Sequence, residues 1–129
     1  MDVAELFQDE SNLTRVCISG AAAKALAGFQ ATKENPSGAL LKKLHHWAKN
    51  GFWNYEAAEG PIRHESDGVY RLGIRLHLYR LIGFYADDDK HVFIIADAYL
   101  KKGQKLSGDD RKRIRHVATC KRDRLWRLT

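Results

Sequence analysis

Basic side chains recur in the second half of this sequence at positions suited to holding a phosphate group. Arg71 and Arg75 alternate with apolar residues along one segment, and Lys101, Lys102 and Lys105 follow a second apolar segment. Arginine suits a phosphate oxygen because its planar fork donates two hydrogen bonds and stays charged. If these segments fold side by side, their cations would line a hollow that accepts a phosphodiester backbone.

The charge of the chain is concentrated in this same half. The 129 residues carry 22 Lys and Arg against 16 Asp and Glu, a net charge of +6. Residues 1–60 carry 6 basic and 7 acidic groups, whereas residues 61–129 carry 16 and 9, a net +7. A local excess of this kind favours a polyanionic partner, although basic surface alone does not prove one.

The elements that must position these cations are read from hydrophobic periodicity. Residues 69–76 alternate apolar and polar side chains with the two-residue period of a strand. A second strand is expected over 78–85, and after the polar turn 87–90 a third over 91–100, so that the last two form a hairpin. Ser107 and Asp110 resemble a capping box and open a terminal helix that carries Arg111 and Arg115.

The first half predicts a strand followed by two helices. Residues 1–12 have no sustained period and are expected to form a loose arm, followed by a strand over 14–18. A helix begins at Ala21, Pro36 breaks the chain, and a second helix ends at Asn50-Gly51. Trp47 and Phe52 are expected in the core. The resulting fold class is α+β: a small antiparallel sheet with an N-terminal helix hairpin and a C-terminal helix.

Length and composition limit the remaining choices. Residues 1–129 are expected to form a single domain with one core. No segment has the length of a membrane-spanning helix, and the two cysteines are far apart, so a cytoplasmic protein without disulfides is expected. The six histidines lack metal-ligand spacing, and no Gly-rich phosphate loop is present, so neither a metal nor another cofactor is predicted.

Three segments together resemble the RelE/ParE superfamily of bacterial toxins, especially its HigB-like or phage Gp49-like branch. They are Tyr70-Arg71-Leu72-Gly73-Ile74-Arg75, Tyr79-Arg80-Leu81-Ile82, and the apolar strand ending in Tyr99-Leu100-Lys101-Lys102-Gly103-Gln104-Lys105. The similarity covers roughly residues 14–125. It implies a RelE-like fold, an antitoxin partner encoded nearby, and, for the RelE and HigB branches, cleavage of mRNA on the ribosome without a metal.

The resemblance also implies roles for single residues. Cleavage through the 2′-hydroxyl needs a proton acceptor, cations for the phosphoryl oxygens and a donor for the leaving 5′-oxygen. The expected phosphate-binding residues are Arg71, Arg80 and Lys102, and the proton acceptor is His64 or Tyr99. The expected contacts to the flanking RNA are Arg75, Lys101, Lys105, Arg111 and Arg115. Gly73 departs from the family, which often has a second basic residue there.

Three functions are therefore compared. The first is a ribosome-dependent mRNA endoribonuclease, the toxin of a type II toxin-antitoxin system. The second is a ParE-like inhibitor of DNA gyrase, which has the same fold without nuclease chemistry. The third is a catalytically inactive phage-derived relative that binds nucleic acid or protein, a possibility that Gly73 supports. Lys101 and Lys102 would also suit an antitoxin that inhibits by covering the RNA surface.

Overall fold

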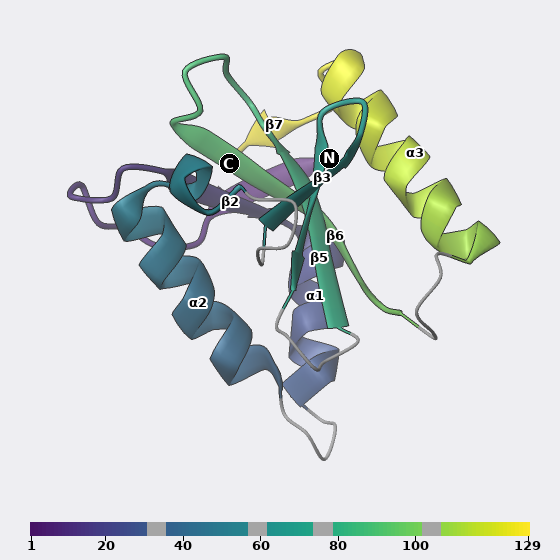
Figure 1. Ribbon diagram of the computed structural model, residues 1–129, viewed down its shortest axis with the longest axis horizontal. Coiled ribbons are helices and arrows are strands. Elements are labelled where there is room, and N and C mark those ends of the chain that lie inside the picture. The colour runs from purple at the N-terminus through teal and green to yellow at the C-terminus, as the bar shows by residue number, and fades with distance from the viewer. Residues whose placement is uncertain (31–35, 57–61, 74–78, 102–106) are drawn as a thin grey trace.

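The computed structural model describes residues 1–30, 36–56, 62–73, 79–101 and 107–129, which form helices on both faces of one sheet (Figure 1). The elements in chain order are β1 (Asp2–Glu5), β2 (Arg15–Ser19), α1 (Gly20–Gln30), α2 (Pro36–Asn50), the 3-10 helix η1 (Phe52–Tyr55), β3 (Ile62–Ser66), β4 (Val69–Gly73), β5 (Tyr79–Tyr85), β6 (Val92–Leu100), α3 (Gly108–Arg122) and β7 (Arg127–Leu128). In these ranges, no helix is both long and apolar enough to cross a lipid bilayer.

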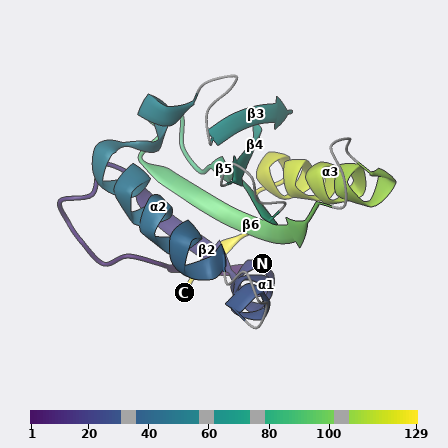
Figure 2. The same cartoon turned by 60° about the horizontal axis from the view of Figure 1, so that its bottom comes forward.

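The strands belong to one mixed sheet. Their order is β3-β4-β5-β6-β2-β1-β7. The hairpin neighbours β3-β4, β4-β5 and β5-β6 pair antiparallel, as does β1 with β2. The pairs β2-β6 and β1-β7 are parallel. The long β6 therefore joins the meander of β3 to β6 to the strands from the two ends of the described chain (Figure 2).

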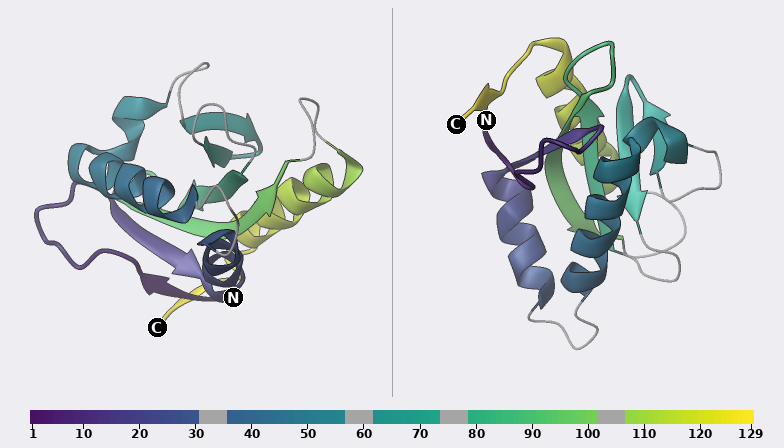
Figure 3. Two further views of the ribbon diagram at one scale, coloured as in Figure 1. Left: turned by 90° about the horizontal axis from the view of Figure 1, so that it is seen from below. Right: turned by 90° about the vertical axis from the view of Figure 1, so that its left-hand side faces the viewer.

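Each face of the sheet has its own apolar core. Helices α1 and α2 cover one face, where Leu44, Trp47 and Phe52 pack with sheet residues such as Phe93. Helix α3 covers the other face, where Ile114 belongs to a second core that includes sheet residues. Figure 3 shows α1 and α2 side by side and α3 across the sheet from them. Because alternate side chains of a strand point to opposite faces, each central strand contributes to both cores.

Several expectations are confirmed. The strands predicted over 14–18, 78–85 and 91–100 are β2, β5 and β6, and the antiparallel hairpin of the last two is present. The expected capping box is present at the start of α3, where Ser107 accepts from the backbone of Asp110. Trp47 and Phe52 are buried in the core. Residues 74–76 of the alternating segment lie outside the described residues.

Other expectations are wrong. Residues 1–12 are not all a loose arm, because residues 2–5 form β1 and pair with both β2 and β7. The sheet is not purely antiparallel, and β3 and β7 were not anticipated. The expected strand before the two helices is β2, but a further strand, β1, precedes it; α1 and α2 contact each other. Strands β1 and β7 are paired with each other although they are far apart in sequence, which local periodicity does not reveal.

Candidate functional site

Cross-strand register brings Arg71, Arg80 and Tyr99 to the sheet face that α3 covers. Arg80 on β5 lies opposite Gly73 on β4 and Tyr99 on β6. Arg71 is two residues from Gly73 on β4, so it lies on the same face. Lys101 follows directly after β6, two residues beyond Tyr99. We call Arg71, Arg80 and Lys101 the cationic cluster.

The guanidinium of Arg80 lies over the backbone of β4. Its Nη1 donates a hydrogen bond of 2.9 Å to the carbonyl oxygen of Tyr79. A β-carbon at Gly73 would lie only 3.0 Å from the Cδ atom of Arg80. Burial and the neighbouring charge of Arg71 lower the pKa of Arg80. The absence of a side chain at Gly73 therefore leaves room for the side chain of Arg80.

Arg71 forms an ion pair with Glu65, a residue that the sequence analysis did not select. Its Nε lies 3.2 Å from Oε1 of Glu65, and the two side chains are 13% and 17% exposed. Glu65 lies where the β3-β4 register shifts between His64 and Ser66. Arg63 pairs with Arg71 across these strands and adds a further, solvent-exposed cation on the same face.

Lys101 is a buried lysine among like charges. It is only 8% exposed. Burial is the largest cause that lowers its pKa, and repulsion from Arg71 and Arg80 lowers it further, while Glu65 and Asp110 act in the opposite direction. A lysine with a lowered pKa releases its proton more readily than an exposed one, and it can serve in acid-base chemistry.

Tyr99 places a phenol next to the cationic cluster. The residue is 4% exposed, and within the described part of the chain its buried hydroxyl has no hydrogen-bond partner. Burial, and then the charge of Asp110, raise the pKa of Tyr99 to about 12. The phenol therefore keeps its proton at physiological pH and is a hydrogen-bond donor rather than a base.

The start of α3 completes this surface. Asp110 is 5% exposed, and one of its carboxylate oxygens accepts from the backbone of Ser107 in the capping box. The site thus combines three cations, the buried phenol of Tyr99 and the carboxylates of Glu65 and Asp110. An excess of buried positive charge beside a hydrogen-bond donor suits a phosphate group and disfavours a cationic or neutral ligand.

The remaining predicted residues do not all join this site. His64 pairs with Tyr70, and its ring packs against Tyr70 at 5.2 Å on the face of α1 and α2, so it lies across the sheet from Arg71. Arg111 and Arg115 are exposed on α3. Three further predicted residues, Arg75, Lys102 and Lys105, lie outside the described residues.

Glu65 and Arg63 were missed because β3 was missed. A signal for β3 was present in Asp67-Gly68, a dipeptide typical of two-residue hairpin turns. Both residues have positive φ values, 51° and 80°, as that turn requires. Among the residues placed by the structure, no three His, Cys, Asp or Glu side chains gather as metal ligands would. The sequence matches no protein-family model and no curated protein.

Proposed function

We propose that this protein is a RelE-like or HigB-like toxin that cleaves mRNA on the ribosome. The observation that carries the proposal is the convergence of Arg71, Arg80 and Lys101 beside the buried hydroxyl of Tyr99. These residues come from the three segments whose sequences resemble the toxin superfamily. A site with this charge would place a phosphodiester beside a proton donor.

The proposed reaction uses the 2′-hydroxyl of the RNA itself. The 2′-oxygen loses its proton to an acceptor and bonds to the phosphorus, the bond to the 5′-oxygen breaks, and that oxygen takes a proton from a donor. The products are a 2′,3′-cyclic phosphate and a free 5′-hydroxyl. Arg71 and Arg80 would stabilise the negative charge that builds on the phosphoryl oxygens. Tyr99 would donate to the leaving oxygen, because its raised pKa keeps it protonated.

Lys101 is the proton acceptor in this proposal. His64 is separated from the cluster by the sheet, and Tyr99 is protonated, so neither suits the role expected from the sequence. Burial and the two arginines lower the pKa of Lys101, which increases its neutral fraction at a given pH. Glu65 would release Arg71 to the phosphate when RNA enters, since an anion competes for the same guanidinium.

The proposal extends to the partner and the compartment. An antitoxin encoded next to this chain would inhibit by placing acidic side chains over the cationic cluster. Action on ribosomes would place the protein in the cytoplasm.

The test is cleavage of mRNA by the purified protein, with and without translating ribosomes, followed by mapping of the new 5′ ends. We expect cuts only when ribosomes are present. Arg80→Ala should abolish them, because it removes a guanidinium from the site. Arg15→Ala is the matched control. Arg15 lies on β2 outside the site, is half exposed and forms an ion pair with Glu5 on β1. Its loss should leave cleavage unchanged.

Other outcomes would favour the other two functions. Intact mRNA together with inhibited DNA supercoiling would support a ParE-like gyrase inhibitor. Intact mRNA, normal supercoiling and salt-sensitive RNA binding would support a relative without catalysis. Cleavage that persists in Arg80→Ala would contradict the site assignment while leaving the activity in place.

A further inference from the structure

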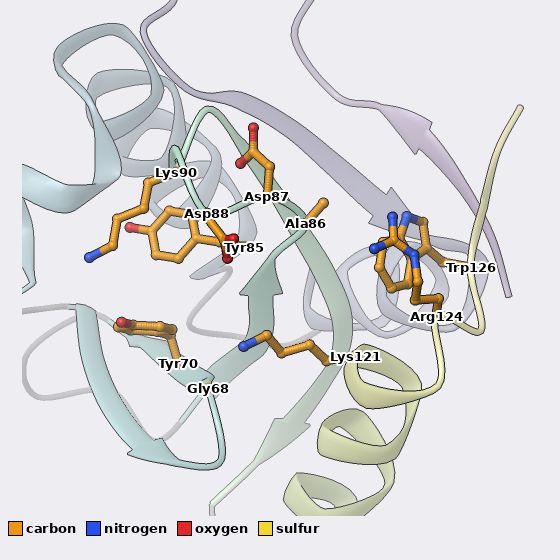
Figure 4. A pocket seen from close by; sticks show the side chains of 10 residues that line it. All are labelled: Gly68, Tyr70, Tyr85, Ala86, Asp87, Asp88, Lys90, Lys121, Arg124 and Trp126. Atoms are coloured by element: carbon orange, nitrogen blue, oxygen red, sulfur yellow. The ribbon is translucent and has the colours of Figure 1, made fainter.

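A pocket lined by basic and aromatic side chains lies at the other end of α3 from the cationic cluster. It has a volume of about 280 Å³ and opens between the β3-β4 turn, the β5-β6 turn and the end of α3 (Figure 4). Helix α3 has 15 residues, so at a rise of about 1.5 Å per residue its two ends are separated by roughly 22 Å. The pocket is therefore distinct from the proposed cleavage site.

Two cations of this pocket have no carboxylate partner among the residues that the structure places. They are Lys121, at the end of α3, and Arg124, just beyond it. The amine of Lys121 points toward Tyr70 in Figure 4, and it approaches Gly68 so closely that a β-carbon at Gly68 would collide with it. The other basic residue of the pocket, Lys90, is neutralised by Glu56 at 3.0 Å.

Arg124 occupies a backbone position that normally favours glycine. Its φ is 53°, and it is the left-handed residue of a Schellman motif, in which Arg124 N–H donates to the carbonyl of Lys121 and Leu125 N–H to that of Cys120. Its guanidinium lies over the ring of Trp126, with the guanidinium carbon 5.3 Å from the ring centroid. A residue with a β-carbon is disfavoured in this left-handed conformation.

The aromatic walls are held firmly. Tyr85 donates a short hydrogen bond to Glu56, and Tyr70 packs edge-on against Tyr85 at 5.3 Å between ring centroids. Trp126 packs against Phe84 at 5.2 Å. Asp87 accepts from the backbone of His91 at 3.0 Å, so this carboxylate is engaged in the turn. Aromatic surface with unpaired cations beside it is the combination that binds single-stranded nucleic acid.

We infer that this pocket binds one nucleotide of a single-stranded RNA, with the base against the aromatic walls and the phosphate on Lys121 and Arg124. The inference rests on the proposed function for the identity of the polymer, and it adds a contact remote from the cut. The exposed carboxylate of Asp88 at the rim would accept from a base amino group. Bases with such a group should therefore bind better than uracil.

The test is binding of a 2′-O-methyl oligoribonucleotide of about eight nucleotides, within the range of single-strand sites, measured by fluorescence anisotropy at several salt concentrations. This probe cannot be cleaved, because its 2′-oxygens are blocked. The double variant Lys121→Ala/Arg124→Ala should bind at least about tenfold more weakly. The slope of log K against log salt should become shallower by about 1.4, the value expected for two lost phosphate contacts on a single strand.

Arg122→Ala is the matched control, because Arg122 lies in the same helical turn but is paired with Asp123 at 3.0 Å and does not line the pocket. This variant should bind as the unmodified protein does. An unchanged salt slope in the double variant, or an equal loss in Arg122→Ala, would overturn the inference. So would a preference of the pocket for an acidic octapeptide over the oligonucleotide. Unchanged thermal unfolding would exclude misfolding as the cause.

A third variant separates this inference from the proposed function. Arg80→Ala should lose ribosome-dependent cleavage and still show the contribution of Lys121 and Arg124 to oligonucleotide binding. If the unmodified protein never cleaves mRNA but binding depends on the pocket, the proposed function fails and the pocket remains. If the protein cleaves mRNA but the loss of Lys121 and Arg124 does not change its affinity for the oligonucleotide, only the inference about the pocket fails.

Discussion

The protonation state of Lys101 decides which of two roles it can have in the candidate site. The ammonium form can bind phosphate, and the neutral form can accept a proton. Its pKa lies below the ordinary value of 10.5 because burial and two arginines disfavour the ammonium form. As pH rises toward this lowered pKa, more of the lysine is neutral and can accept a proton. We therefore expect single-turnover cleavage to become faster with rising pH over this range.

Lys101→Arg tests this role directly. Arginine keeps the positive charge but does not lose its proton in proteins, so RNA binding should persist while cleavage falls at least about 100-fold. The measurement is single-turnover cleavage beside oligonucleotide affinity. Lys112→Arg, on the exposed surface of α3, should leave both unchanged. A cleavage rate that survives Lys101→Arg would show that Lys101 only binds phosphate.

Tyr99 makes a prediction that does not depend on RNA. Its pKa is about 12 in the folded protein, against an ordinary value of 10. Between these two pH values the unfolded chain loses the phenol proton while the folded protein retains it, so this residue makes stability fall as pH rises. Tyr99→Phe should reduce that loss. Near-ultraviolet titration of tyrosinate should also show one high-pKa group fewer than in the unmodified protein.

The β5-β6 hairpin depends on one glycine. Gly83 lies beside the register shift in this pair, and a β-carbon there would collide with the carbonyl oxygen of Ile94. Gly83→Ala should therefore lower the free energy of unfolding by about 1–3 kcal/mol, the usual cost of forcing extra atoms into a packed region. Chemical denaturation followed by circular dichroism measures this change.

A second glycine provides the comparison. Gly28 lies within α1 and has no atoms within 4 Å of the position that a β-carbon would take. Gly28→Ala should stabilise the protein by about 0.5–1 kcal/mol, because alanine loses less backbone freedom than glycine on forming a helix. Equal effects at the two positions would contradict the close approach described for Gly83.

The molecule as a whole should be stabilised by a tetrahedral anion. Sulfate resembles phosphate and would relieve the repulsion among the cationic cluster in the folded protein. At about 100 times its dissociation constant, a ligand bound only by the folded state adds about 2.7 kcal/mol. Sulfate also stabilises proteins in general by exclusion from their surface, so the informative quantity is the difference between variants.

Arg80→Ala supplies that difference. Its melting temperature should rise less with sulfate than that of the unmodified protein, each compared with chloride at equal ionic strength. Arg15→Ala should behave like the unmodified protein, since Arg15 is paired with Glu5 outside the cluster. Identical gains in all three proteins would mean that the cluster does not bind the anion.

Local features of the chain were sufficient to predict β2, β5, β6 and the start of α3. Each of these depends on side chains within a few positions of one another: short apolar, β-rich runs in the strands, and the Ser107-Asp110 capping box at the helix. The clustering of basic residues in the second half likewise needs no structure, and it indicated Arg71 and Lys101 as candidates, whereas Arg80 was implied by the resemblance to the toxin superfamily.

Tertiary structure decided which of these side chains meet. The register shift in β3 accompanies the pairing of Glu65 with Arg71 and leaves His64 on the opposite face, because the facing of side chains in a strand depends on residue parity. The pairing of β1 with β7 joins residues more than 120 positions apart. Such contacts depend on the path of the whole chain, so a local pattern of residue types does not predict them.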